Sequence, residues 1–414
     1  MEEHAGPDWP RLWQLLVRCS QRESCDRCWR QLCECCDSGR QAKMRARHQS
    51  WLKYYSFQGI WAYLCFFLPL VLVTSCHKPS PTQPSVGLDT TSHSFTWQIT
   101  LLGDGLSSSM LNDVAIINDT LAYAVGEIFL RDSTGQEDFN PYNAAIWNGR
   151  SWTIQRIPYY YQGQALYQPI RWIYALSESD IWFENSVRWN GQAFENVDIG
   201  TSVFLGIGSR KMWVSTNGLM YIVGNSGTIA LSTNHGSTWQ ALASGTTLPF
   251  QDIWGAANPA TGQTEVLAVA SNTIAVPSGK KLLRITGTTV STVSDSGLSF
   301  ALSGIWFLPN EIYYLVGGGI YYSGTVGTGT IWKGELSAVT PYYTEDVRGN
   351  GPNDVFVVGD YGEILHFNGA SWRSFRSETG LTNGRYRRVA VAGNLVIAVG
   401  DEGDQAVVAV GRHQ

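Results

Sequence analysis

Short apolar runs with polar residues at alternate positions recur through the last three quarters of the chain, and they predict β-strands. The clearest unit is NDVFVVGDYGEILHFNGASW, residues 353–372, which reads as an alternating strand, a glycine turn, a second strand, an Asn-Gly turn and a closing Ser-Trp. Related units lie before and after it in the chain. They cover residues 121–152, 179–194, 219–239, 251–271, 303–322 and 389–410.

The spacing of these units predicts the architecture. Seven units follow one another at intervals of about 40 to 48 residues, which is the length of a four-stranded propeller blade. The last unit lacks a closing Ser-Trp strand, and SFTWQITLL, residues 94–102, supplies one ahead of the first unit. We therefore predict an all-β fold, a β-propeller of seven four-stranded blades over residues 94–414, closed by its N-terminal strand. Six or eight blades also fit, because the units at Asp252 and Ser303 are degenerate.

Composition agrees with many short strands joined by tight turns. The chain has 17 Trp, 43 Gly and 15% charged residues, whereas an average globular chain has about 25% charged residues. Most tryptophans after residue 93 occupy matching positions of the units, so we interpret them as rings packed between adjacent blades rather than as a ligand platform. The net charge of −5 gives no basic footprint, so no nucleic-acid partner is expected.

The first 93 residues follow a different pattern. An apolar run of 14 residues, Ile60 to Val73, follows a basic flank and contains Pro69. It is shorter than the roughly 20 residues of a spanning helix, so we interpret residues 44–75 as a secretory signal. The run ends in Val-Thr-Ser-Cys, which resembles a bacterial lipobox and implies cleavage and lipid attachment at Cys76. The alternative is a cysteine that merely ends a membrane helix.

Two further segments flank this signal. Residues 76–93 begin with the proposed anchor cysteine and continue as a linker rich in Pro, Ser and Thr, which is too polar to fold and would act as a tether. Residues 1–43 contain six cysteines. Their spacing could suit zinc in a reducing compartment, but no complete site is present. We favour translation starting at Met44, with a cytosolic Cys-rich tail before a true membrane anchor as the alternative.

Residues 223–247, VGNSGTIALSTNHGSTWQALASGTT, resemble the repeat of the BNR/Asp-box propellers, which include sialidases, and especially that of the photosystem II assembly and stability factor family. The unit at residues 353–372 resembles the repeat of bacterial lipid-anchored propellers of unknown role. The resemblance implies the fold and a structural corner in which Asn234 replaces the usual aspartate. The corner residues are Ser232, Asn234, Gly236, Thr238 and Trp239.

The sialidase branch of this resemblance implies further residues that the chain does not clearly supply. Arg156-Ile157-Pro158 matches a short arginine motif, but it follows the end of an outer strand. Three arginines, a tyrosine nucleophile with a glutamate partner and an acidic aspartate would also be required. No spacing singles out such a set among the candidates Arg171, Arg188, Arg284, Arg348 and Tyr314. Three arginines or paired carboxylates gathered on one propeller face would favour a glycan-active protein.

Other catalytic signatures are also missing from the sequence. The chain contains no Gly-x-Ser-x-Gly elbow, no HExxH motif and no P-loop. The histidines after residue 76, apart from His77 next to the anchor, are scattered, so we expect no metal site, no cofactor and no catalytic residue. They are His93, His235, His366 and His413.

Tyrosine-rich loops are the candidates for a ligand face. One loop contains Tyr159, Tyr160 and Tyr161, and another contains Tyr342 and Tyr343. Exposed tyrosines suit protein and glycan interfaces, and the alternative is that these rings pack over blade edges.

Together these patterns predict a non-enzymatic envelope lipoprotein whose propeller binds a protein partner. It would be exported and anchored to a bacterial membrane, with the outer membrane as the expected one and the side left open. The alternative is a carbohydrate-binding or sialidase-like propeller.

Overall fold

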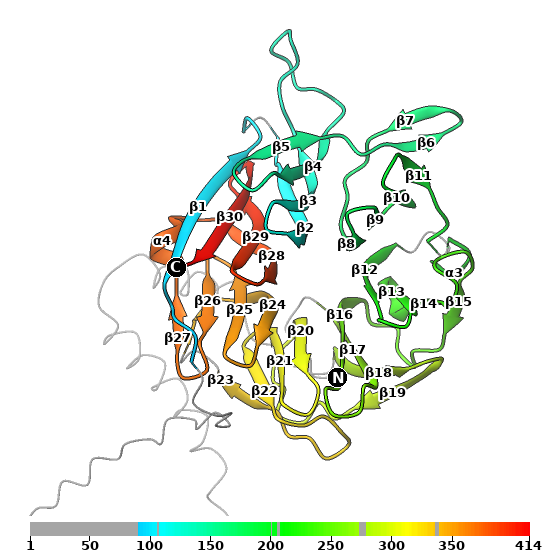
Figure 1. Cartoon of the computed structure of the whole chain (residues 1–414), viewed down its shortest axis with the longest axis vertical. Helices are drawn as coiled ribbons and strands as arrows, with labels where there is room; N and C mark the ends of the chain where they lie inside the picture. The colour runs from blue at the N-terminus through cyan, green and yellow to red at the C-terminus, as the bar shows by residue number, and fades with distance from the viewer. Residues whose placement is uncertain (1–89, 106, 200, 205–207, 273–278, 336–338) are drawn as a thin grey trace, which may run out of the picture. The chain divides into compact units, whose positions relative to one another are not determined.

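The computed structural model describes residues 90–414 apart from 106, 200, 205–207, 273–278 and 336–338. These residues form seven four-stranded antiparallel sheets around a ring, together with one two-stranded hairpin (Figure 1). The predicted all-β propeller with seven blades is therefore confirmed, and counts of six and eight are wrong. Cys76, the signal at residues 44–75 and the segment 1–43 lie outside the described residues.

Six blades are each built from four strands in chain order, with the first strand innermost. Blade 1 has β2 (Met110–Asn118), β3 (Leu121–Ile128), β4 (Tyr142–Trp147) and β5 (Trp152–Gln155). Blade 2 has β8 (Ile173–Ser177), β9 (Asp180–Phe183), β10 (Val187–Trp189) and β11 (Phe194–Asn196). Blade 3 has β12 (Ser209–Val214), β13 (Met220–Gly224), β14 (Ile229–Ser232) and β15 (Gln240–Leu242).

The remaining blades repeat this plan. Blade 4 has β16 (Phe250–Ala257), β17 (Thr264–Ser271), β18 (Lys280–Thr286) and β19 (Thr289–Val293). Blade 5 has β20 (Leu302–Leu308), β21 (Ile312–Gly317), β22 (Ile320–Ser323) and β23 (Lys333–Glu335). Blade 6 has β24 (Thr344–Gly351), β25 (Asp354–Gly359), β26 (Ile364–Phe367) and β27 (Trp372–Ser374). The short elements are the hairpin β6 (Tyr159–Tyr161) and β7 (Gln164–Leu166), η1 (Asn225–Gly227), α3 (Thr201–Phe204) and α4 (Arg376–Thr379).

Blade 7 joins the two ends of the propeller. Its inner strands are β28 (Arg385–Ala392), β29 (Leu395–Glu402) and β30 (Gln405–His413), and its outermost strand is β1 (Phe95–Leu102). β1 pairs antiparallel with β30, from Phe95 opposite His413 to Leu102 opposite Ala406. The strand that precedes the first repeat thus completes the last blade, as the missing Ser-Trp strand predicted.

Apolar side chains between neighbouring blades form the core. Trp306 of blade 5 packs with Val347 of blade 6, and similar clusters fill the other interfaces. Trp147 and Trp306 are 1% exposed, which agrees with a structural role for these rings. The packing is close: a Cβ atom added to Gly255 of blade 4 would lie 2.4 Å from the ring of Trp213 in blade 3.

A β-bulge recurs near the start of the innermost strands and positions the site described below. The register shifts at the same point in six of these seven strands, between residue pairs such as Leu111/Asp113 and Ser209/Lys211. A bulge adds one unpaired residue and re-aims its side chain. The bulged residues are Asn112, Arg210, Gln251, Ser303, Glu345 and Arg387.

The innermost strands all begin on one face of the ring, which we call the crossover face. Because the strands of each blade alternate in direction, the loops between blades and the turns between second and third strands lie on this face. The turns between first and second strands, and between third and fourth strands, lie on the opposite face. Within the described part of the chain, no helix has the length and apolar character needed to cross a membrane.

Candidate functional site

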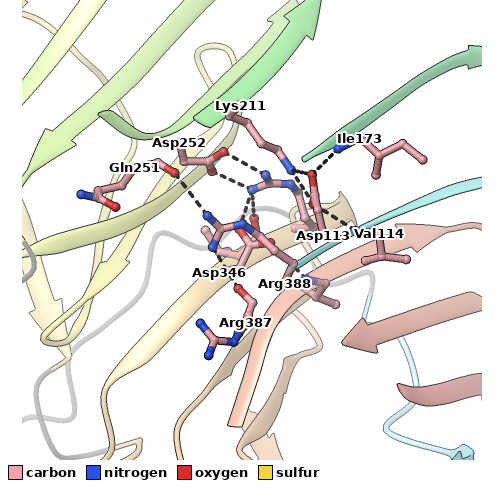
Figure 2. A network of polar contacts seen from close by, with 12 residues as sticks. Asp113, Val114, Ile173, Lys211, Gln251, Asp252, Asp346, Arg387 and Arg388 are labelled. Atoms are coloured by element: carbon pink, nitrogen blue, oxygen red, sulfur yellow. Dashed lines mark hydrogen bonds and ion pairs between the residues drawn. The ribbon is translucent and has the colours of Figure 1, made fainter. Parts of the chain in front are cut away.

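A buried cluster of charged side chains, which we call the charge plug, occupies the centre of the ring at the level of the bulges (Figure 2). It combines three carboxylates with three cations, so its net formal charge is zero. All but Arg388 are at most 8% exposed. The plug consists of Asp113 on β2, Lys211 on β12, Asp252 on β16, Asp346 and Arg348 on β24, and Arg388 on β28.

The plug contains two close ion-pair systems. The Lys211 ammonium lies 2.7 Å from both carboxylate oxygens of Asp113. The Arg348 guanidinium donates from Nη1 and Nη2 to the two oxygens of Asp252, at 2.9 and 3.1 Å, and Nη1 also lies 2.9 Å from Asp346 Oδ1. Bidentate pairs of this kind fix both partners, and a buried charge requires such compensation.

Each aspartate of the plug also ties its blade to the next one. Asp113 Oδ2 accepts a hydrogen bond of 3.0 Å from the backbone N–H of Ile173, the first residue of β8. Asp252 and Asp346 make the equivalent bonds, of 3.0 Å to Ile305 and 3.1 Å to Val389. The plug is therefore a structural lock between innermost strands as well as a charged floor.

Burial and charge act against each other on the two carboxyls that share Arg348. Burial disfavours the charged form of Asp252, but Arg348 overcomes it and holds the pKa of this carboxyl below its usual range. Burial raises the pKa of Asp346, and Arg348 and Arg388 offset this only in part. The two aspartates raise the pKa of Arg348, which stays a cation.

The bulged residues on the crossover side of the plug form a second layer, which we call the channel mouth. Arg210 is its most informative member. The Arg210 guanidinium lies 2.9 Å from Gln251 Oε1 and 2.5 Å from Asn225 Oδ1, so both of these partners are neutral amide oxygens. Burial lowers the pKa of Arg210, and so do the nearby cations Arg388 and Arg171, whereas the Glu184 carboxylate opposes them in part. A guanidinium held in place by amides beside like charges has the properties of an anion-binding group.

Arg171 occupies the matching position of blade 2, just before β8. Its Nε lies 2.9 Å from Glu184 Oε1, and its backbone N–H donates to Glu184 Oε2 at 2.6 Å. The Arg171 side chain is 59% exposed, whereas that of Glu184 is 4% exposed. Burial raises the pKa of Glu184, against the effect of Arg171. Arg171 can therefore reach a ligand while its own carboxylate partner is shielded.

The far side of the mouth carries mixed charge. Arg387 Nε lies 2.7 Å from Asp401 Oδ1. Burial raises the pKa of Glu345, despite the nearby Arg388. Burial, and then Glu345, raise the pKa of Tyr343 to about 12. The positive side of the mouth is thus the side formed by blades 2 and 3.

A hollow of about 210 Å³ lies next to the plug along the central channel. Lys211 and Arg348 line it together with mostly apolar and aromatic residues, among them Tyr174, Trp213 and Trp254. Across residues 90–414, outside the gaps given above, no group of three or more His, Cys, Asp or Glu side chains is arranged to hold a metal ion.

The structure does not bring the predicted tyrosines together. Tyr160 and Tyr161 are 46% and 56% exposed on the β6–β7 hairpin, and Tyr159 is half-buried. This hairpin extends from the ring between blades 1 and 2 (Figure 1). Tyr342 lies before blade 6, with its ring 5.0 Å from that of Tyr361, and Tyr343 lies beside the mouth as described above.

The corner resembling an Asp-box joins β14 to β15 on the face opposite the mouth. Ser232 Oγ accepts a hydrogen bond of 2.9 Å from the Gly236 N–H, and Asn234 Oδ1 accepts one of 2.9 Å from the Thr238 N–H. The Trp239 indole donates to the backbone oxygen of Asp198 at 2.8 Å. These bonds are local, and they are consistent with the structural role that the resemblance implies.

Most arginines considered for a carboxylate site belong to different blades and are already paired. Arg156 pairs with Asp138 and Arg284 with Glu265, while Arg348 belongs to the plug. Arg188 pairs with Asp180 and Glu195, and Tyr314 is 1% exposed beside Trp306.

Arg210 instead has two cations near it, Arg171 and Arg388. Of these three arginines, only Arg171 was among the candidates from the sequence. The sequence signal that could have revealed these arginines is the short segment at the start of each innermost strand. These segments are NDV, RWI, RKM, QDI, SGI, EDV and RRV, beginning at residues 112, 171, 210, 251, 303, 345 and 387.

No protein-family model and no curated protein sequence matches the chain. Solved propellers do match it in structure. YCF48 bound to a D1 peptide is 16% identical, over 77% of this chain and 97% of that one, with a TM-score of 0.53. Virginiamycin B lyase from Staphylococcus aureus with quinupristin is 9% identical, over 77% of this chain and 100% of that one, with a TM-score of 0.55. The WD40 repeats of RRP9 are 8% identical, over 79% and 99%, with a TM-score of 0.52.

At these identities the likeness establishes the propeller fold. The set includes both a peptide-bound propeller and a lyase, so the fold alone does not distinguish a binding protein from an enzyme.

Proposed function

We propose that this chain is a protein-binding propeller whose channel mouth binds an acidic segment of a partner. The observation that carries the proposal is Arg210, which is held by Gln251 and Asn225 and stands near Arg171 and Arg388. An incoming carboxylate would relieve the repulsion among these cations. It could also accept charge-assisted hydrogen bonds from guanidinium groups, which suit carboxylates better than ammonium groups do.

Exposed apolar side chains on the crossover face favour a macromolecule over a small anion. They lie on the loop between β3 and β4 and on the β6–β7 hairpin, which contacts the outermost strand of blade 2 through the Tyr160 N–H and Asn196. Phe139 is 94% exposed, and Tyr160, Tyr161 and Leu166 are each at least 37% exposed. Exposed apolar groups on the face that also carries an arginine-rich centre suit a protein partner large enough to reach both. The likeness to a propeller solved with a peptide supports this choice but does not carry it.

The cellular setting is a further part of the proposal and rests on the sequence pattern alone. Cys76 would carry the lipid, and residues 77–93 would tether the propeller to a bacterial membrane. The crossover face could then reach a partner within the envelope. Detection of a lipidated N-terminus at Cys76 by mass spectrometry would support this part, and recovery of peptides from residues 1–43 would contradict it.

Two observations favour a second candidate, a glycan-active site. Arg171 and Arg388 lie near Arg210, so the mouth has the three arginines on one face that such a protein was expected to show. Tyr343 lies close to Glu345 and Arg388, which is the kind of group that a sialidase-like reaction would use. However, burial and Glu345 raise the pKa of Tyr343 to about 12, which opposes formation of a phenolate nucleophile. We therefore expect the mouth to bind its ligand and not to hydrolyse a glycan.

The test is equilibrium binding of labelled synthetic peptides to the full chain, read by fluorescence anisotropy. The probes are a ten-residue peptide rich in Asp and Glu and its Asn and Gln counterpart. Arg210→Gln removes the central cation, and Arg150→Gln is the control, because Arg150 is exposed in a turn between third and fourth strands on the opposite face.

We expect the acidic peptide to bind more tightly than the neutral one and to weaken as salt rises. Arg210→Gln should weaken binding of the acidic peptide about tenfold or more, since a charge-assisted hydrogen bond is worth roughly 1.5–3 kcal/mol. Arg150→Gln should leave it unchanged. Equal binding of both peptides would contradict the proposal, and cleavage of a fluorogenic sialoside would favour the second candidate.

A further inference from the structure

Residues 91–94, which we call the strap, cross from the closing strand β1 onto blade 6. The Thr91 N–H donates to the backbone oxygen of Asn368 at 3.2 Å, and Asn368 Nδ2 donates back to the Thr91 oxygen at 3.0 Å. On blade 7, His413 Nε2 lies 3.2 Å from the Ser92 oxygen, and the Gln414 N–H donates to the Ser94 oxygen at 2.9 Å. The strap therefore fixes the point at which the chain leaves the propeller.

A pair of histidines lies at the centre of the strap. His93 Nδ1 lies 2.9 Å from Nδ1 of His366, which is 0% exposed on β26. His93 Nε2 lies 3.1 Å from Ser371 Oγ. His366 Nε2 lies 3.0 Å from Asp354 Oδ1 on β25. Every ring nitrogen of the pair thus has a partner, and these partners decide where the protons lie.

Proton counting limits the charge that the pair can hold. Because the Asp354 carboxylate accepts, His366 Nε2 carries a proton. The contact between the two Nδ1 atoms needs one N–H and one lone pair, so only one of these atoms can be protonated. The docked pair can therefore be neutral or singly charged. A second charge places two N–H groups against each other and breaks the contact.

The surroundings reinforce this limit. The ring of Phe356 stacks on His366 with centroids 4.5 Å apart, and Phe95 packs edge-on against His366 at 5.2 Å, so the buried ring has little room to turn. Arg373 on β27 adds a nearby cation, and its Nη1 donates to the His93 oxygen at 3.4 Å.

Other charged groups face the strap from both blades. On blade 6, Asp354 is the one negative group in direct contact with the pair, and Glu378 is paired with Arg373. On blade 7, His413 adds another titratable ring beside Phe95.

We propose that the strap is an acid-sensitive fastening, released when the docked histidine pair takes up a second positive charge. Release would free residues 91–94 and so lengthen the chain that leads to β1. At 3.3–3.6 Å per extended residue this adds about 14 Å of reach. The propeller would stay closed, because β1 remains paired with β30 from Phe95 onward.

The sign of the pH effect follows from His93. Burial, His366 and Arg373 all lower the pKa of His93 in the docked strap. The released strap therefore binds more protons than the docked one, and docking weakens as pH falls. The change should begin below about 6.5, the ordinary pKa of a free histidine.

The test is hydrogen exchange of the full chain, followed by mass spectrometry, at pH 7.5 and pH 5.0 after correction for intrinsic exchange rates. In the unmodified protein we expect the amides of residues 91–94 to lose at least tenfold in protection at pH 5.0. Amides in the middle of β29 should stay protected. Unchanged protection of residues 91–94 would overturn the proposal.

Two variants identify the titrating group. In His93→Gln, the strap can stay docked or be released at both pH values. In either case the protection of its amides should show no step, that is, no change between pH 7.5 and pH 5.0. His413→Gln, the matched control, changes another histidine that contacts the strap and should keep the step. A step that survives in His93→Gln, or disappears in His413→Gln, would overturn the assignment.

Discussion

Lys211→Met is the substitution that examines the charge plug most directly. Methionine keeps most of the side-chain volume and removes only the ammonium, which lies 2.7 Å from both oxygens of Asp113. The Asp113 side chain is 2% exposed, so its carboxylate is shielded from bulk solvent. Its remaining hydrogen bonds come from the N–H groups of Val114 and Ile173, both at 3.0 Å.

The expected loss follows from this geometry. Removing one partner of a buried ion pair typically costs about 3–5 kcal/mol, and the two backbone N–H bonds that remain on Asp113 place this case near the lower value. Adding Asp113→Leu removes the stranded charge, but it also leaves the Val114 and Ile173 N–H groups without an acceptor, at about 1–3 kcal/mol for each group. These costs are as large as the loss itself, so the second substitution should not restore the stability of the unmodified protein.

The assay is urea unfolding at pH 7, followed by tryptophan fluorescence. Lys211→Met should lower the free energy of unfolding by about 3 kcal/mol, and the double variant should stay less stable than the unmodified protein. Arg150→Met, on the exposed surface, should change it by less than about 0.5 kcal/mol. A loss below about 1 kcal/mol for Lys211→Met would refute the view that the plug locks the inner strands.

Three further predictions concern other parts of the propeller. Gly255→Ala places a Cβ 2.4 Å from the Trp213 ring and should lower the free energy of unfolding by about 1–3 kcal/mol in the same urea assay. An unchanged urea midpoint would contradict the close packing of blades 3 and 4. Asn234→Ala removes the hydrogen bond from the Thr238 N–H and should lower the free energy of unfolding by about 1 kcal/mol. It should leave the affinity for the acidic peptide unchanged, because this corner lies on the face opposite the mouth. A loss of peptide binding would contradict that separation. Burial raises the pKa of Glu345, so the folded state binds a proton at this carboxyl more readily than the unfolded state does. The stability of Glu345→Gln relative to the unmodified protein should therefore be higher at pH 7 than at pH 4. The opposite order of these free energies in urea unfolding would contradict this.

The propeller could be predicted from sequence because its information is local and repeated. Each blade encodes its own alternation, turns and tryptophan, and the surplus Ser-Trp strand at residues 94–102 marks the closure of the ring. The bonds of the Asp-box-like corner are local for the same reason, since Ser232, Asn234 and Thr238 lie within seven residues of one another.

The plug and the mouth could not be predicted in this way, because their partners come from different blades. Lys211 and Asp113 are 98 residues apart, and Arg348 and Asp252 are 96 residues apart. Only the ring closure and the repeated bulge bring them together. The sequence likewise named the tyrosines at 159–161 and at 342 and 343 as candidates for a ligand face, but it could not show that the two groups lie at different places on the ring.

Site-specific photocrosslinking tests the central claim, that the mouth on the crossover face is where an acidic segment binds. A photoreactive residue at Ser226, beside the Asn225 that holds Arg210, is compared with one at Asn217, which is exposed in a turn on the opposite face of the same blade. The account predicts that a labelled peptide rich in Asp and Glu crosslinks at Ser226 and not at Asn217, and that Arg210→Gln abolishes the crosslink. Equal crosslinking at the two positions, or crosslinking that survives Arg210→Gln, would contradict it.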